Sequence, residues 1–372
     1  MLQMVKLNES TVTGSYYIDE TEIGETLTIT SSNVFGIVKG TDLRLGSKCK
    51  VNDLSAKAID FNDSLFKWNV TISESLVGET TLENATFRNM LRLQRVMAYD
   101  GCIRLNRARV TDISISWARG STTVECKQAR LGNLKTSVPE AGLLWDRLHI
   151  NRTQFNEFDF ADFTASLSST NHLIHKDEQR NRLARYCSFL PTFLQHGQQL
   201  RSGDMDNLIK MYEDREVTYR RAKDSADTTG DNPAASKFYM HEKKYRRRRQ
   251  FWAMFTSEGN RIRNGVVWAT NLGLGVLAGH GERASQVGAS AFTWVVIFGL
   301  LLSIIPSPTA DGTMLQPAIA FEQSLRTFVS APSAIDQMDP SPFVERLLLV
   351  ERALGIAYIP LLVFALTRSL HR

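Results

Sequence analysis

The sequence is poor in the residues that build metal centres and disulfide scaffolds. It has four cysteines in 372 residues, and they form no C-x-x-C pair: Cys49, Cys102, Cys126 and Cys187. Such wide spacing argues against a zinc site or a disulfide framework and is typical of a protein in a reducing compartment. The closest histidine pair, His172 and His175, has no acid or cysteine beside it at ligand spacing, so we expect a surface helix there rather than a metal.

Motifs of enzymes and of exported proteins are also missing. The chain contains no Gly-Lys-Ser/Thr phosphate-binding loop and no nucleophile elbow, so we expect no enzymatic activity, no cofactor and no metal. Its first ten residues, MLQMVKLNES, contain no apolar stretch, and we therefore expect no cleavable signal peptide.

Two apolar runs near the C-terminus are the main feature that is present. Residues 347–367 form a run of 21 with no charge between Ala353 and Leu366, and residues 289–305 form a run of 17 uncharged residues. About 20 apolar residues cross the hydrocarbon core of a bilayer, and both runs lack the polar face of a surface helix. We expect two membrane spans, at about 289–305 and 347–367. The alternative is a buried helical hairpin in a soluble core.

A dense basic cluster precedes the first run. Six of seven consecutive positions carry a cation: Lys243, Lys244, Arg246, Arg247, Arg248 and Arg249. The link between the runs, residues 307–342, has a single cation, Arg326. This asymmetry follows the positive-inside rule, so it predicts a multi-pass protein of the cell membrane with both termini in the cytoplasm and the cluster as a membrane-proximal flank. A solvated helix face and a nucleic-acid patch are the alternatives; we expect no nucleic-acid partner.

Residues 264–278 are apolar, but the run is short and Gly265, Gly273 and Gly275 interrupt it. Cations lie on both sides. We expect an interfacial helix or a re-entrant piece here, with a third full span as the alternative.

The first 165 residues show short alternating stretches rich in Val, Ile, Thr and Asn, which favour β-strands. Four segments share the pattern apolar, x, x, small, x, apolar, x, Asn or acid, and return every 21 to 24 residues: 82–89, 105–112, 126–133 and 150–157. Such a period predicts a solenoid, in which each coil buries its apolar residues against its neighbours. An ordinary β-sandwich is the alternative.

Two helical regions are expected to follow the solenoid. Residues 166–205 form a cap or linker, and residues 206–262 form a helical hairpin that carries the basic flank. Gly230 ends the first helix of the hairpin and Pro233 fits the first turn of the second. The stretch from Gly230 to Tyr239 resembles a tetratricopeptide-type helix pair.

Several short motifs together resemble a known family. The steps Asp42-Leu43 and Asn84-Ala85 and the A-x-[FVL] rungs resemble a degenerate pentapeptide-repeat domain. The stretches 279–283 (GHGER) and 351–355 (ERALG) resemble archaeal proteins that join pentapeptide repeats to a two-span potassium-channel-like pore module. The resemblance covers nearly the whole chain and is strongest from about residue 210 onward.

That resemblance implies a mixed fold and an archaeal source. It implies an N-terminal right-handed, four-sided β-helix at 1–165, a helical-hairpin linker, and a two-span α-helical membrane domain at 263–372 with a re-entrant pore-like loop at 321–340. It also implies a homo-oligomer in the membrane, a tetramer if the module is a pore.

The sequence departs from this family at the selectivity filter. Channels of this type carry T-x-x-T-x-G-Y-G-D, whose backbone carbonyls replace the hydration shell of potassium. Here residues 327–336 read TFVSAPSAID and contain no glycine, which such a filter needs because glycine reaches φ > 0 without cost. The pore-loop candidates are Thr327, Ser330, Ser333 and Asp336, and we expect no potassium selectivity.

Three residues of the second run are inner-helix or gating candidates: Glu351, Gly355 and Pro360. Gly355 occupies the place of that family's inner-helix glycine, and glycine and proline both permit a bend. Glu351 lies either at the outer interface or against the pore loop or an aqueous cavity, because intramembrane acids face protein or water.

Two functions follow from this reading. The first is an oligomeric pore, non-selective or gated, controlled by its cytoplasmic solenoid. The second is a membrane-anchored scaffold whose solenoid binds a protein partner and which does not conduct ions.

Overall fold

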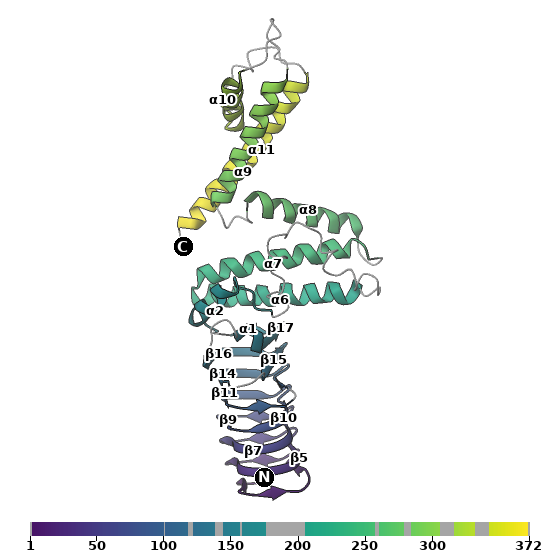
Figure 1. The fold of residues 1–372 in the computed structure, drawn as a ribbon, viewed down its shortest axis with the longest axis vertical. Helices are drawn as coiled ribbons and strands as arrows, with labels where there is room; N and C mark the ends of the chain where they lie inside the picture. The colour runs from purple at the N-terminus through teal and green to yellow at the C-terminus, as the bar shows by residue number, and fades with distance from the viewer. Residues whose placement is uncertain are drawn as a thin grey trace. The chain divides into compact units, whose positions relative to one another are not determined.

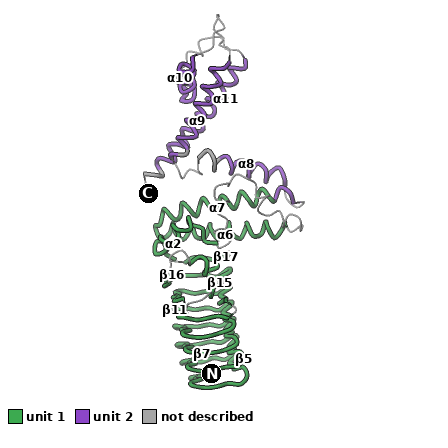
Figure 2. The backbone as a smooth tube through the Cα atoms, in the orientation of Figure 1, with its two compact units in different colours: residues 1–252 green, residues 253–372 purple. Residues whose placement is uncertain are grey.

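The computed structural model of the chain describes residues 2–99, 101–117, 122–137, 144–156, 158–175, 205–256, 260–278, 284–305, 316–331 and 342–370. The chain divides into two compact units, Met1–Trp252 and Ala253–Arg372 (Figure 2). The predicted fold class is confirmed: a parallel β-solenoid is followed by helices, two of which are candidate membrane spans.

The first unit begins with short parallel strands stacked coil upon coil (Figure 1). The strands are β1 (Val5–Asn8), β2 (Thr11–Val12), β3 (Tyr16–Tyr17), β4 (Glu22–Ile23), β5 (Leu27–Lys39), β6 (Arg44–Leu45), β7 (Cys49–Asp60), β8 (Leu65–Phe66), β9 (Val70–Ser73), β10 (Leu76–Thr81), β11 (Thr86–Gln94), β12 (Met97–Ala98), β13 (Cys102–Arg104), β14 (Arg109–Ser116), β15 (Thr123–Lys127), β16 (Arg130–Ser137), β17 (Leu148–Asn151) and β18 (Gln154–Phe155).

Residues one coil apart lie directly above one another. One such column contains Val5, Leu27, Cys49, Val70, Leu91, Ile113 and Leu134, so the stack has about seven turns. Another contains Ile23, Leu45, Phe66, Phe87, Val110, Leu131 and Phe155. All of the second column is buried, and the rings of Phe66 and Phe87 stack with their centroids 5.0 Å apart.

The repeat read from the sequence gives the register of the coils. Ala85, Ala108 and Ala129 are fully buried, and each directly follows a residue with positive φ: Asn84, Arg107 and Gln128. The predicted solenoid at 1–165 therefore corresponds to strands that span residues 5–155.

The corners of the coil use an unusual backbone conformation. A residue with positive φ recurs at intervals of ten to twelve, or twice per coil: Glu9, Glu20, Ser31, Asp42, Asp53, Asp63, Glu74, Asn84, Arg95 and Arg107. Asn and Asp tolerate this left-handed region better than most residues, whereas Arg and Glu do not. Because corners stack on corners, the side chains at these positions form columns on the solenoid surface.

Aromatic rings and helices close the C-terminal end of the solenoid. The helices of this unit are α1 (Leu144–Arg147), the 3-10 helix η2 (Ala161–Phe163), α2 (Thr164–Ser169), α6 (Met205–Thr229) and α7 (Asn232–Ala253). Phe158 and Phe160 are buried between the last coil and Phe238 of α7, with Phe160 and Phe238 centroids 4.8 Å apart. Of the predicted cap at 166–205, residues 176–204 lie outside the described part of the chain.

Hydrogen bonds fix α6 on the last coil. The Ser225 hydroxyl donates to the carbonyl of Phe158 at 3.1 Å, and the Arg152 amide donates to Thr218 Oγ1 at 2.8 Å. Asp214 accepts from Arg152 and Asn151, so polar groups at the open end of the stack are satisfied by the helix.

The second unit consists of α8 (Arg261–Ala278), α9 (Ala284–Ile304), α10 (Pro317–Phe328) and α11 (Pro342–Leu370). Two stretches are long and apolar enough to cross a membrane, Val287–Ile304 and Pro342–Thr367. They begin at Val287 and Pro342, earlier than the expected 289 and 347, because helices α9 and α11 start at Ala284 and Pro342. Residues 264–278 lie in α8, which Asn260 caps through its side chain (3.0 Å to the Arg263 amide).

Candidate functional site

The short helix α10 packs between α9 and α11, and two glycines let it approach them closely. A Cβ at Gly299 of α9 would lie 3.1 Å from Phe321 Cα. A Cβ at Gly355 of α11 would overlap the backbone carbonyl of Phe328. The C-terminal end of α10 therefore touches the α11 backbone at a position where only glycine fits.

A buried polar contact joins all three helices. The Ser324 hydroxyl of α10 lies 2.9 Å from the carbonyl oxygen of Val295 in α9 and also contacts Glu351 Oε1 of α11. Ser324 and Glu351 are both fully buried. A hydroxyl carries one proton, so Ser324 donates to one of these two acceptors at a time.

Two polar atoms beside this contact have no hydrogen-bond partner among the residues that the structure describes. They are the second carboxylate oxygen of Glu351 and the hydroxyl of Thr327, and both are buried. An unsatisfied buried polar group lowers the stability of the fold. The packing of α9, α10 and α11 must therefore hold these two atoms in place. The structure puts Glu351 against Ser324 of α10, in the stretch 321–340 where a re-entrant loop was expected.

The pore-loop candidates are only partly within the described chain. Thr327 lies on the last turn of α10, and Ser330 (φ 57°) ends that helix in the left-handed region. The amide of Ala331 donates to the Arg326 carbonyl at 2.8 Å, which completes a Schellman-type cap. Ser333 and Asp336 lie outside the described residues, and Pro360 lies inside α11.

The basic cluster lies on α7, and much of it is engaged within the hairpin. Arg249 pairs with the buried Glu216 at 3.0 Å, and Lys243 lies 4.7 Å from the ring centroid of Tyr239. Lys244 and Arg248 lie 5.9 and 5.8 Å from the centroid of the Tyr245 ring. Arg246 and Arg247 are half-buried. The cluster is thus a structural part of the hairpin in addition to any role as a membrane flank.

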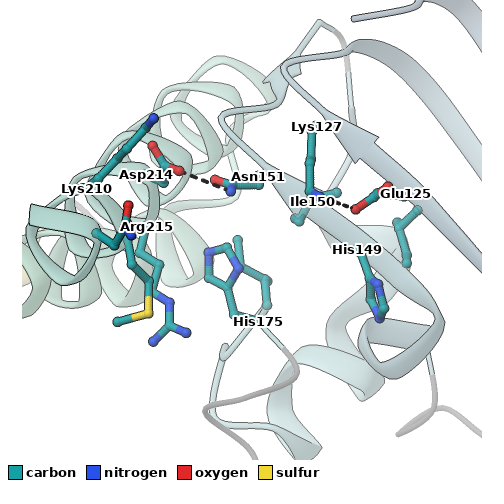
Figure 3. A pocket seen from close by; sticks show the side chains of 13 residues that line it. Glu125, Lys127, His149, Ile150, Asn151, His175, Lys210, Asp214 and Arg215 are labelled. Carbon is teal, nitrogen blue, oxygen red and sulfur yellow. Dashed lines mark hydrogen bonds and ion pairs between the residues drawn. The ribbon is translucent and has the colours of Figure 1, made fainter. Parts of the chain in front are cut away.

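A cavity of about 370 Å³ lies in the first unit between the last coils and α6 (Figure 3). Its wall carries both charge signs, with Glu125 and Lys127 from β15 and Asp214 and Arg215 from α6. Burial opposes the charge of Glu125, but bonds from Lys127 and Asn106 outweigh this and lower its pKa. The acids of this wall are therefore already paired within the protein.

His175 lies between α6 and β17 at this cavity (Figure 3). Its ring is 5.5 Å from that of Tyr219, which also contacts His241 at 5.0 Å. Burial, with Arg215 as a further cause, lowers the pKa of His175 to about 3, and burial lowers that of His241 to about 3 as well. The expectation of a surface helix at His172 and His175 is wrong: both precede residue 176 in a non-helical segment and pack on α6 and α7.

No metal centre is found in the part of the chain that the structure describes, where no three His, Cys, Asp or Glu side chains come together. Sequence reasoning missed the Ser324–Glu351 contact, the paired Glu216 and the buried histidines. Only Glu351 carried a signal, as an acid inside an apolar run. No protein-family model, no curated protein and no solved structure matches this chain.

Proposed function

We propose that residues 284–370 form a channel-like pore module in the membrane, which conducts ions without potassium selectivity as a homo-oligomer under the control of the solenoid. The observation that carries the proposal is the packing of α10 between two candidate spans. Gly299 and Gly355 let α10 approach both of them closely, and Ser324 of α10 contacts Glu351. A short helix held between two long apolar helices is the layout of a cation-channel pore module.

The surface of the unit supports a membrane setting. Large apolar side chains of α9 and α11 are exposed: Phe292, Leu300, Ile304, Leu349, Ile356, Val363 and Phe364. A soluble protein rarely exposes so much contiguous apolar surface, whereas lipid or a second subunit covers it without cost. This argues against the buried hairpin in a soluble core. The short α10 accounts for part of the 37-residue link, residues 306–342.

The experiment is reconstitution of the purified chain in planar bilayers, with the oligomeric state measured in detergent by light scattering. We expect four copies per particle and cation currents with a potassium-to-sodium permeability ratio near unity. Glu351→Gln should change the conductance because it removes a buried carboxylate that contacts α10. The matched control is Glu322→Gln, since Glu322 is an exposed acid on α10 paired with Arg326 at 2.7 Å. A monomer, or release of the chain from membranes by alkaline carbonate, contradicts the proposal.

A second candidate is a membrane-anchored scaffold. The absence of any glycine in residues 327–336 favours it, because a filter lacking that backbone freedom need not conduct. This function predicts an assembly without current in bilayers, while the solenoid unit retains a protein partner that dissociates when surface residues of the coils are changed.

A further inference from the structure

Stacked coils bring arginines together on the solenoid surface next to α6. Arg109 and Arg130 are register partners on adjacent strands β14 and β16. Arg107 and Arg152 occupy the left-handed corners of their coils, with the corner of Gln128 between them. Because neighbouring coils are about 4.8 Å apart, these side chains form two adjacent columns, and Arg221 of α6 lies beside them.

These five arginines line one cavity of about 350 Å³, together with Gln128 and Gln154. Arg152 is neutralised by Glu213 at 3.0 Å and by Asp214. The other four guanidinium groups have no acidic partner among the described residues. Arg107 bonds only to Gln128 (3.3 Å), and Arg221 donates to the backbone carbonyl of Arg152.

Such crowding of like charge is unfavourable without a counter-charge. Burial, and then repulsion from Arg152 and Arg130, lowers the pKa of Arg221. A phosphate group carries about −1.5 to −2 charges at neutral pH, so four uncompensated cations match about two phosphate groups. The planar arginine fork also suits phosphate oxygens through paired hydrogen bonds.

A second cavity adjoins the arginines. It has a volume of about 480 Å³ and shares Gln154 and Arg221 with the first. Its wall includes Phe155, Asn156 and Asp224, so it offers an aromatic edge and polar groups to the organic part of a ligand.

We propose that this arginine cavity binds a small molecule with two linked phosphate groups, whose organic part enters the adjoining cavity. The two phosphates lie across the Arg107 and Arg109 columns, and Arg221 of α6 closes on them. Since α6 also fixes the hairpin to the last coil, ligand binding ties the solenoid to the hairpin. The proposal depends on the first unit alone and holds whether or not the second unit conducts ions.

The test measures binding of pyrophosphate, ADP and orthophosphate to the full-length chain in a phosphate-free maltoside detergent by titration calorimetry. We expect saturable pyrophosphate binding that is about tenfold tighter than orthophosphate binding. The double variant Arg109→Gln/Arg130→Gln should weaken pyrophosphate binding at least about tenfold. Tighter binding of ADP than of pyrophosphate places the organic part in the adjoining cavity.

The control variant is Arg44→Gln. Arg44 occupies the same column as Arg109, three coils away through Leu65 and Thr86, and is exposed. It should leave binding unchanged. A second readout is thermal unfolding. Without ligand the double variant should unfold at the same or a higher temperature than the parent, because repulsion is relieved, and pyrophosphate should stabilise only the parent and Arg44→Gln.

Three results overturn the proposal. They are absence of saturable pyrophosphate binding, equal binding by the parent and the double variant, and equal loss of binding in Arg44→Gln. Binding of an acidic peptide with no competition from pyrophosphate also overturns it and assigns the arginines to a protein partner.

Discussion

Gly355 of α11 packs directly on the backbone carbonyl of Phe328, the last residue of α10, and leaves no room for a Cβ. This relationship sets the position of α10 relative to the longer of the two candidate spans. Its consequence is that the smallest change at residue 355 acts on a helix 27 positions earlier in the chain.

The first prediction is that Gly355→Ala displaces α10. The added methyl group must push the Phe328 carbonyl away, and overpacking of this kind costs about 1–3 kcal/mol. We expect a lower unfolding temperature of the detergent-solubilised chain and an altered conductance in bilayers.

The control for this change is Gly288→Ala in α9. A Cβ there meets nothing within 4 Å, so the variant should unfold like the parent or slightly later, because alanine favours a helix. Equal effects of the two substitutions would show that α10 does not rest on Gly355.

The second prediction concerns the Ser324 hydroxyl. Ser324→Ala removes the donor shared by the Val295 carbonyl and Glu351 and leaves both acceptors buried. Leaving a buried acceptor without its donor costs about 1–3 kcal/mol. We expect destabilisation of this size, measured by chemical unfolding in detergent. In the Glu351→Leu background Ser324→Ala should cost less, because there it removes only the bond to the Val295 carbonyl.

A third prediction follows from the ion pair that joins α6 to α7. Glu216 is 2% exposed and lies between Arg220 and Arg249 at 2.9 and 3.0 Å. Glu216→Gln removes the buried carboxylate from Arg249 and leaves the half-exposed Arg220 with its 3.5 Å pair to Glu242, so we expect a loss of about 2 kcal/mol in the free energy of unfolding.

Asp227→Asn is the surface comparison for Glu216→Gln. Asp227 pairs with Lys223 at 3.3 Å on the exposed face of α6, where such pairs contribute below about 1 kcal/mol. If both variants lose the same stability in urea titrations, Glu216 has no special role in the hairpin.

The fourth prediction is a dependence of stability on pH in the first unit. The pKa of His175 and that of His241 are lowered to about 3 in the fold, below the ordinary value near 6.5. The unfolded chain therefore binds protons first as the pH falls, so stability is full above about 6.5 and is lost progressively below it. At pH 5.5 the loss is on the order of 1 kcal/mol for each histidine.

Several charged groups face these imidazoles and contribute to the same profile. Arg215 of α6 and Lys244 and Lys237 of α7 disfavour their protonation. The double variant His175→Gln/His241→Gln should flatten the pH dependence between 6.5 and 4.5 in thermal unfolding followed by circular dichroism. An unchanged slope would place the acid sensitivity elsewhere in the chain.

The coil register was accessible from the sequence, whereas the surface clusters were not. The repeat positions Phe87, Val110 and Leu131 identified the buried column directly, because a residue at the same point of each coil meets the same neighbours. The arginine cavity could not be predicted from the period alone. Arg107, Gln128 and Arg152 are 21 and 24 residues apart, and only the exact corner positions place them together. Spacing alone gives the period but not the corners.

In the second unit, too, the long helices could be predicted from the sequence, whereas the contacts between them could not. Hydropathy predicted the two long helices, since their apolar runs are continuous. Helix α10 (Pro317–Phe328) overlaps the re-entrant loop expected at 321–340 but begins four residues earlier, with Pro317 in its first turn. The pairing of Ser324 with Glu351 depends on how three helices pack, and no single stretch of sequence encodes it.

The stacked corners also determine how such a chain can change in length. A block of 21 or 22 residues inserted at a corner adds one complete coil, and every inward side chain still points inward. An insertion of a single residue instead reverses the facing of all those that follow within its strand. The solenoid between the chain's first strand and α6 can therefore lengthen or shorten between relatives only by whole coils. Such a change leaves the helices at its C-terminal end unaltered.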